Sequence, residues 1–196
     1  AVTATTTTTT TASPASDTGE NNVVPMKEYF VKHVITLDGI DAFTFNNNDK
    51  VRDCFTAAVA NTLTIPETNI YNVRACESGQ TEEECINAAA EQGNKRRLRN
   101  RKNRRLSASV SDVRYEIKAD SEEEMQSIFN EIPEMPQTVI TANFVDELNK
   151  KLSNEEVMDM TNGMGLDSVN AVPSTTASKE VKEQNNTPAT PGGTVT

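Results

Sequence analysis

Eight cationic side chains lie within the eleven positions from Lys95 to Arg105. Two features of this run suit proteolytic chemistry. Residues 101–104 read Arg-Lys-Asn-Arg, which fits the minimal R-x-x-R site of a subtilisin-like convertase, and a dibasic pair ends the run. The spacing therefore predicts a processing site whose residues are Arg101, Arg104, Arg105 and Leu106.

The same run has a second interpretation as a flexible polycation that binds an acidic surface with salt-sensitive affinity. Sulfated polysaccharide and silica are surfaces of this kind, and a solvated loop with neither role is a third interpretation. Processing and binding do not exclude one another. The candidate anion-binding residues are Lys95, Arg96, Arg97, Arg99, Arg101 and Lys102.

The rest of the chain is acidic, because the net charge is −10 although 8 of the 19 basic residues belong to this run. A general nucleic-acid binder needs a broad basic face, so nucleic acid is not an expected partner. No apolar run approaches the roughly 20 residues of a membrane span, so no span is expected.

Three cysteines are too few for a disulfide scaffold. Cys76 and Cys85 are the natural pair if the compartment is oxidising, and two free thiols if the protein is cytosolic. Cys54 falls on an apolar helix face and is expected to be a buried free thiol. Because the chain has one histidine and no C-x-x-C spacing, no structural metal is expected.

Catalytic signatures are missing from the sequence. It has no phosphate-cradling glycine loop and no nucleophile elbow, so neither an enzyme nor a cofactor is expected. His33 shares the apolar face of a predicted strand, which favours a structural role. The acidic runs 82–84 and 122–124 are typical of the first turns of helices.

Hydrophobic periodicity predicts the elements around the basic run. Four strands and three helices alternate as strand, helix, strand, strand, helices, strand. This order predicts an α+β fold, the ferredoxin-like split βαββαβ, with a four-stranded antiparallel sheet and helices on one face. The expected strands are 29–37, 69–76, 109–119 and 166–172, and the expected helices are 49–63, 121–132 and 141–152, with a further turn at 153–160 and a capping box at 81–84.

Composition divides the chain into three parts. Residues 1–24 are Thr-rich and are expected to be a disordered, O-glycosylated linker. Residues 25–172 are expected to form one domain with the basic insertion at 77–106. Residues 173–196 are expected to be a second disordered Thr/Pro-rich linker, in which Asn185 begins a glycosylation sequon.

The element order, the Thr/Ser-rich flanks and the position of the basic loop resemble secreted SEA domains over about residues 27–172. That resemblance implies a hairpin between the second and third strands that is cut by proteolysis. Self-cleaving SEA domains carry Gly-Ser there, whereas residues 106–110 read Leu-Ser-Ala-Ser-Val without the glycine, so self-cleavage is not expected. The motifs Arg96-Arg97-Leu98 and Arg104-Arg105-Leu106 also resemble the Arg-x-Leu processing motif of microalgal cell-wall and silica-associated secreted proteins.

These features predict a non-enzymatic, extracellular interaction and spacer module of a glycosylated surface or matrix protein, cut in its basic loop. Its expected partners are other domains or matrix proteins and a processing protease. The alternative is a module that binds an anionic polymer or mineral surface through the loop. An RNA-recognition domain shares the strand order but needs exposed aromatic residues on its third strand, where Tyr115 is expected to point inward.

Overall fold

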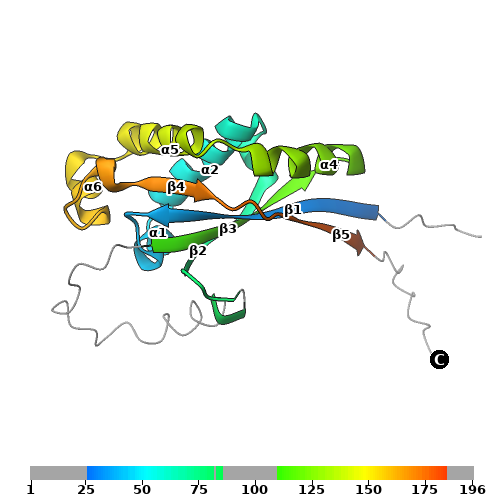
Figure 1. The fold of residues 1–196 in the computed structure, drawn as a ribbon, viewed down its shortest axis with the longest axis horizontal. Coiled ribbons are helices and arrows are strands. Elements are labelled where there is room, and N and C mark those ends of the chain that lie inside the picture. The colour runs from blue at the N-terminus through cyan, green and yellow to red at the C-terminus, as the bar shows by residue number, and fades with distance from the viewer. Residues whose placement is uncertain (1–25, 82, 86–109, 185–196) are drawn as a thin grey trace, which may run out of the picture.

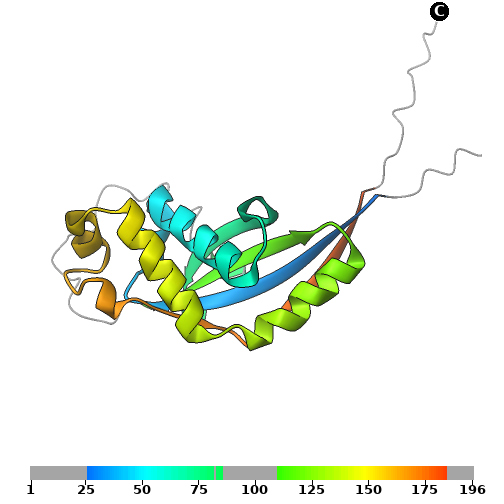
Figure 2. The same cartoon turned by 90° about the horizontal axis from the view of Figure 1, so that it is seen from above.

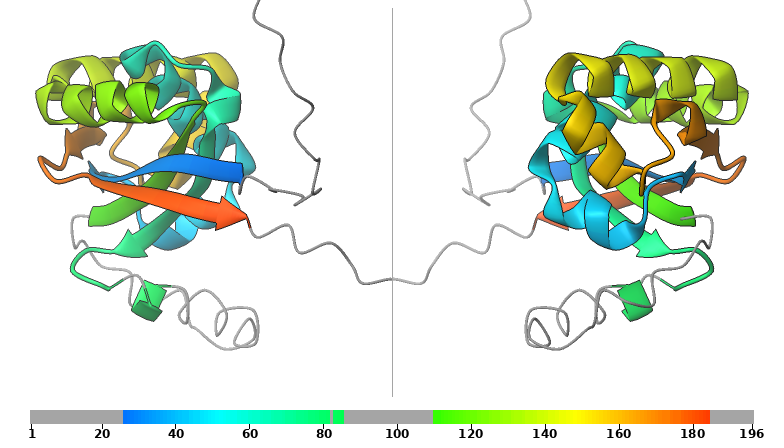
Figure 3. Two further views of the ribbon diagram at one scale, coloured as in Figure 1. Left: turned by 90° about the vertical axis from the view of Figure 1, so that its right-hand side faces the viewer. Right: turned by 90° about the vertical axis from the view of Figure 1, so that its left-hand side faces the viewer.

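The computed structural model of the chain describes residues 26–81, 83–85 and 110–184 (Figure 1). The fold is α+β, with an open antiparallel sheet and helices α2, α4 and α5 over one face of it. Helices α1 and α6 lie together at one end (Figure 3). In chain order the elements are β1 (Met26–Asp38), α1 (Ala42–Asn47), α2 (Asp49–Leu63), η1 (Glu67–Asn69), β2 (Ile70–Glu77), β3 (Val110–Ala119), α4 (Glu122–Glu131), η3 (Ile132–Glu134), α5 (Gln137–Lys151), α6 (Asn154–Met160), η4 (Leu166–Ser168), β4 (Asn170–Pro173) and β5 (Ser178–Gln184).

Strand β1 organises the sheet, whose order is β2-β3-β1-β4 with β5 also paired to β1. Strand β1 has 13 residues, and its residues 29–38 pair with β3 along one side. On the other side, β4 pairs with the second half of β1 and β5 pairs with the first half. All of these pairs are antiparallel, so β4 and β5 act as one interrupted edge strand.

Helix α2 provides the centre of the core, and its predicted bounds of 49–63 are confirmed. Asn48 caps it by accepting a hydrogen bond from the backbone N–H of Val51. Phe55 packs edge-on against Phe45, Tyr115 and Phe144, with ring centroids 5.5, 5.7 and 5.8 Å apart. Edge-to-face contacts of this kind add to the burial of the rings themselves. Figure 2 shows α2 and α5 side by side across the sheet.

A side chain from α1 forms hydrogen bonds with the outer edge of β2. The amide of Asn46, from α1, donates to the carbonyl of Ala75 at 2.7 Å and accepts from its N–H at 2.9 Å. The register of β2 also shifts between Tyr71 and Arg74, where Asn72 has a φ of 54°. An edge strand that is bulged and capped in this way is a poor template for another chain.

The turn after β1 forms at Gly39, within the Asp38-Gly39 turn that the sequence predicts. Gly39 has a φ of 88°, a left-handed conformation that side chains other than glycine rarely adopt. A Cβ at this position would lie 2.6 Å from the backbone oxygen of Ser168. The turn therefore requires glycine both for its dihedral angle and for space.

The structure corrects the prediction of a disordered linker over 173–196, because residues 178–184 form β5. This segment reads SKEVKEQ and is rich in charge, so composition favours disorder. The strand forms because the first half of β1 offers unpaired backbone groups along its edge. Lys182 also lies 4.2 Å above the ring of Phe30, and Lys32 pairs with Glu180 at 3.0 Å. The ordered domain thus extends beyond the predicted boundary at residue 172.

Other boundaries differ from the predictions by smaller amounts. Helix α5 begins at Gln137 rather than 141, since Pro136 presets the backbone for the turn that follows it. The last predicted strand, 166–172, begins only at Asn170, because residues 166–168 form a 3-10 turn. The short helix α1 (Ala42–Asn47) was not predicted.

Candidate functional site at the base of the basic insertion

A disulfide bond marks the base of the basic insertion. Cys76, near the end of β2, is bonded to Cys85, and their Cα atoms are 5.4 Å apart. The predicted pair is therefore confirmed, and both residues are buried. Cys54 is the buried free thiol that the sequence predicts, and its burial raises the pKa of the thiol to about 11. At neutral pH it is a protonated, unreactive group.

Within the disulfide loop, the predicted capping box forms. The backbone N–H of Thr81 donates to the carboxylate of Glu84 at 2.8 Å, and the N–H of Glu84 donates to the hydroxyl of Thr81 at 3.3 Å. The hydrogen bonds from Thr81 lower the pKa of the Glu84 carboxyl. Figure 1 shows that this turn lies on the side of the sheet opposite α2, α4 and α5.

The predicted processing and anion-binding residues all belong to the segment 86–109, which lies outside the described residues. Asn185 and the predicted linker 1–24 lie outside them as well. The structure does describe the two points at which this segment is attached to the domain. It leaves the described chain after Cys85 and rejoins it at Val110, the first residue of β3.

The insertion divides the strands of the sheet into two alternating sets. Strands β1 and β2 precede it in the chain, and β3, β4 and β5 follow it. Because the sheet order is β2-β3-β1-β4, with β5 also on β1, neighbouring strands always come from opposite sides of the insertion. The disulfide bond joins two residues that both precede segment 86–109.

His33 ties β1 to two later parts of the chain. Its Nε2 lies 2.7 Å from the carbonyl oxygen of Ser174, and its Nδ1 lies 2.8 Å from the hydroxyl of Tyr115. A carbonyl only accepts hydrogen bonds, so Nε2 carries the proton and the tyrosine hydroxyl donates to Nδ1. Burial lowers the pKa of the imidazole. Both ring nitrogens are occupied, which agrees with the structural role that the sequence predicts.

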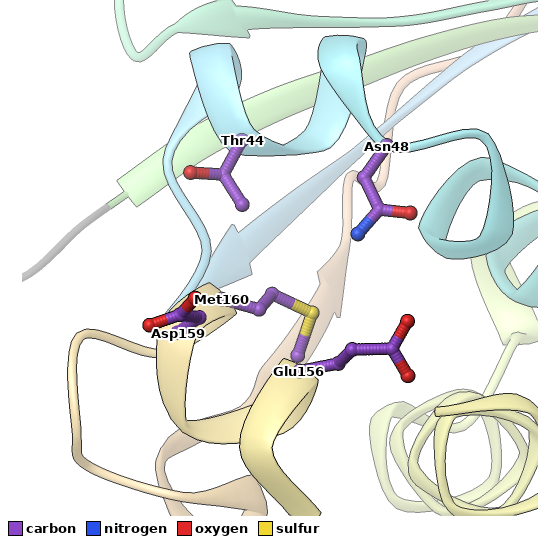
Figure 4. A pocket seen from close by; sticks show the side chains of 5 residues that line it. All are labelled: Thr44, Asn48, Glu156, Asp159 and Met160. Atoms are coloured by element: carbon purple, nitrogen blue, oxygen red, sulfur yellow. The ribbon is translucent and has the colours of Figure 1, made fainter. Parts of the chain in front are cut away.

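A small pocket of about 190 Å³ lies between the α1–α2 turn and α6 (Figure 4). It contains two carboxylates, those of Glu156 and Asp159. Glu156 is already bonded to Lys50 at 2.7 Å and caps α6 through Ser153. These contacts lower the pKa of Glu156 to about 2, so it is a fixed anion and cannot exchange a proton near neutral pH.

Arg74 and Arg114 are directly opposite one another on β2 and β3, an arrangement that sequence reasoning missed. Alternation along each strand places both side chains on the solvent face. Their juxtaposition depends on the register across the bulge at Tyr71/Arg74, which strand periodicity alone does not specify.

Comparison of the chain with protein-family models, with curated proteins and with solved structures returned no match. None of the described helices is long and apolar enough to cross a membrane. Among residues 26–81, 83–85 and 110–184, no group of three or more His, Cys, Asp or Glu side chains could hold a metal ion.

Proposed function

We propose that the chain is a non-enzymatic extracellular module of a glycosylated surface or matrix protein, and that it is cut within its basic insertion. The fold we propose for it is the ferredoxin-like split βαββαβ arrangement of an SEA-like domain. This assignment is supported by a sheet in which β1 and β3 are central. An oxidising compartment is supported by the buried Cys76–Cys85 disulfide.

The alternation of strands is the observation that carries this proposal. After a cut between Arg105 and Leu106, the first piece would hold β1 and β2, and the second would hold β3, β4 and β5. Each strand interface would then join the two pieces, and so would the core between α2 and α5. The backbone ladders and the shared core would hold the pieces together without a covalent bond, since the disulfide lies within the first piece.

The ends of the domain support a role under tension. Met26 and Gln184 are paired across β1 and β5, so the two flanking segments leave from the same end of the sheet. If the parent protein has several domains in a row, this module would project to one side of the row and add little to its length. A pull on both flanks would open the β1–β5 ladder one pair at a time, and a cut chain would then separate into two pieces without further peptide-bond cleavage.

The test is the intact mass of the protein from its natural source, measured under denaturing and reducing conditions, with N-terminal sequencing of any fragments. The expected result is two fragments, one of which begins near Leu106, that migrate as one species by native size exclusion. The control variant replaces Arg101, Arg104 and Arg105 by Gln and should remain one chain. One intact, unglycosylated chain in the cytosol would overturn the proposal.

Binding to an anionic polymer through the insertion is the second candidate, favoured by eight cationic residues within an otherwise acidic chain. Retention on a heparin-like resin should fall when four arginines of the run are changed to Ser, and a variant of equal charge should keep it. Unchanged retention would remove this candidate. The test variant changes Arg96, Arg97, Arg99 and Arg101, and the control changes Lys27, Lys50, Lys150 and Lys151.

A further inference from the structure

A second cationic site lies on the face of the sheet opposite α2, α4 and α5, and its lining residues are outside the basic insertion. A pocket of about 350 Å³ crosses this face from β2 to the segment that links β4 to β5. Arg74 and Arg114 line one side of it, and Ser174 and Thr176 line the other. All four residues lie in the described part of the chain.

Some of the charged side chains around the pocket form ion pairs with one another. The carboxylate oxygens of Glu116 lie 3.7 Å from the Nζ of Lys32 and 3.6 Å from the Nζ of Lys182. A carboxylate oxygen of Glu180 lies 3.0 Å from the Nζ of Lys32 and 3.5 Å from the Nζ of Lys182. Two lysines and two carboxylates therefore neutralise one another. Arg114 is not part of this network, and within the described ranges its hydrogen-bond acceptor is the backbone carbonyl of Gln80.

The guanidinium of Arg114 has further capacity to donate. Its Nε is buried and has no hydrogen-bond partner among the described residues. A buried donor that makes no hydrogen bond is costly, so an acceptor that enters the pocket would be stabilised by bonding to it. The residue opposite Arg114 on β2 is Arg74, whose side chain lines the same pocket. An oxyanion in the pocket would accept a hydrogen bond from this Nε.

The far side of the pocket supplies neutral hydroxyls. The hydroxyls of Ser174 and Thr176 lie 2.9 Å apart, and Ser174 is fixed by its backbone bond to Val34. Val34 is opposite Arg114 on β1 and forms the floor between the two sides. Guanidinium groups bind oxyanions through paired N–H donors, and hydroxyls complete the set of donors that a sulfate group requires.

We propose that this pocket binds one sulfate-type oxyanion, held by Arg114 and Arg74. The anion is either free in solution or carried on a sulfated glycan. The inference does not rest on the proposed function, because no residue of the basic insertion takes part. It rests on the cross-strand arginine pair, the buried donor of Arg114 and the hydroxyls that face them.

The test is calorimetric titration of the full chain with sodium sulfate at constant ionic strength, with chloride as the reference salt. Wild type should bind sulfate saturably with one site per chain. Arg114→Gln should raise the Kd at least about tenfold, since a charge-assisted contact of this kind is lost. Arg114→Lys should also weaken binding, because it keeps the charge and loses the fork. Lys27→Gln, an exposed site at the far end of the sheet, should leave the Kd unchanged.

Circular dichroism in chloride shows whether each variant is folded. Arg114→Gln and Arg114→Lys are two separate tests, so either variant can be used if the other does not fold. No saturable binding by wild type, or equal Kd values for wild type and both Arg114 variants, would overturn the inference. A sulfated disaccharide distinguishes the two sources of the anion. Tighter binding than free sulfate, lost in Arg114→Gln, indicates a glycan ligand, and weaker binding indicates a free anion. A chain with its four loop arginines changed to Ser should bind sulfate as wild type does.

Discussion

The stability of the domain should fall as the pH decreases below about 6.5, because His33 is buried in its neutral form. Its Nε2–H donates to the Ser174 carbonyl and its Nδ1 accepts from the Tyr115 hydroxyl. A second ring proton would face a hydroxyl whose own hydrogen must then turn into the apolar core. Protonation is therefore easier in the unfolded chain than in the folded one.

The sign and size of this effect follow from proton linkage. The folded pKa lies below the unfolded value, so the unfolded chain binds more protons between the two values. The free energy of unfolding should thus rise with pH across this window and reach its full value above about pH 6.5. With one proton involved, the slope is at most about 1.4 kcal/mol per pH unit.

The assay is urea unfolding at intervals from pH 7.5 to pH 5.5. His33 is the only histidine in the chain, so no other imidazole contributes in this range. Carboxylates such as Glu156, whose folded pKa is about 2, lose their contribution only as the pH falls below about 4.5. A His33→Gln variant should show a flat profile. A flat profile in wild type, or the same slope in the variant, would refute the reasoning.

Three further predictions concern parts of the fold that the structure makes specific. Gly39→Ala should lower the free energy of unfolding by roughly 2–4 kcal/mol, because the backbone has a positive φ there and the new Cβ would clash with the backbone of Ser168. Gly163 also has a positive φ but is surrounded by open space, so Gly163→Ala should lower the free energy of unfolding by only about 1–2 kcal/mol. Equal losses for the two variants would contradict the role of the clash. Replacing Cys76 and Cys85 by Ser should cost roughly 2–3 kcal/mol by urea unfolding, and a reducing agent should then have no effect on the variant. Asn46→Ala should cost about 1–2 kcal/mol and expose the β2 edge, which size exclusion at high concentration would detect as self-association; a monomer of unchanged stability would contradict the capping role.

Interactions between residues close together in the sequence are sufficient to predict several elements of this protein. The helix at 49–63 follows from an Asn48 cap and an apolar stripe, because both act within a few residues of the backbone they order. The capping box at Thr81 and Glu84 and the pairing of Cys76 with Cys85 are short-range in the same sense. The alternation of β3 likewise placed Tyr115 in the core.

Only the tertiary structure decided which distant backbones meet. Strand β5 has a composition that favours disorder, and it is ordered because β1 extends beyond β4 and offers it an edge. The opposition of Arg74 and Arg114 depends on a bulge that sets the register of β2 against β3. Periodicity identifies the face on which a side chain lies, whereas pairing between strands far apart in sequence identifies its neighbour. That physical difference explains why the elements were predictable and the arginine pocket was not.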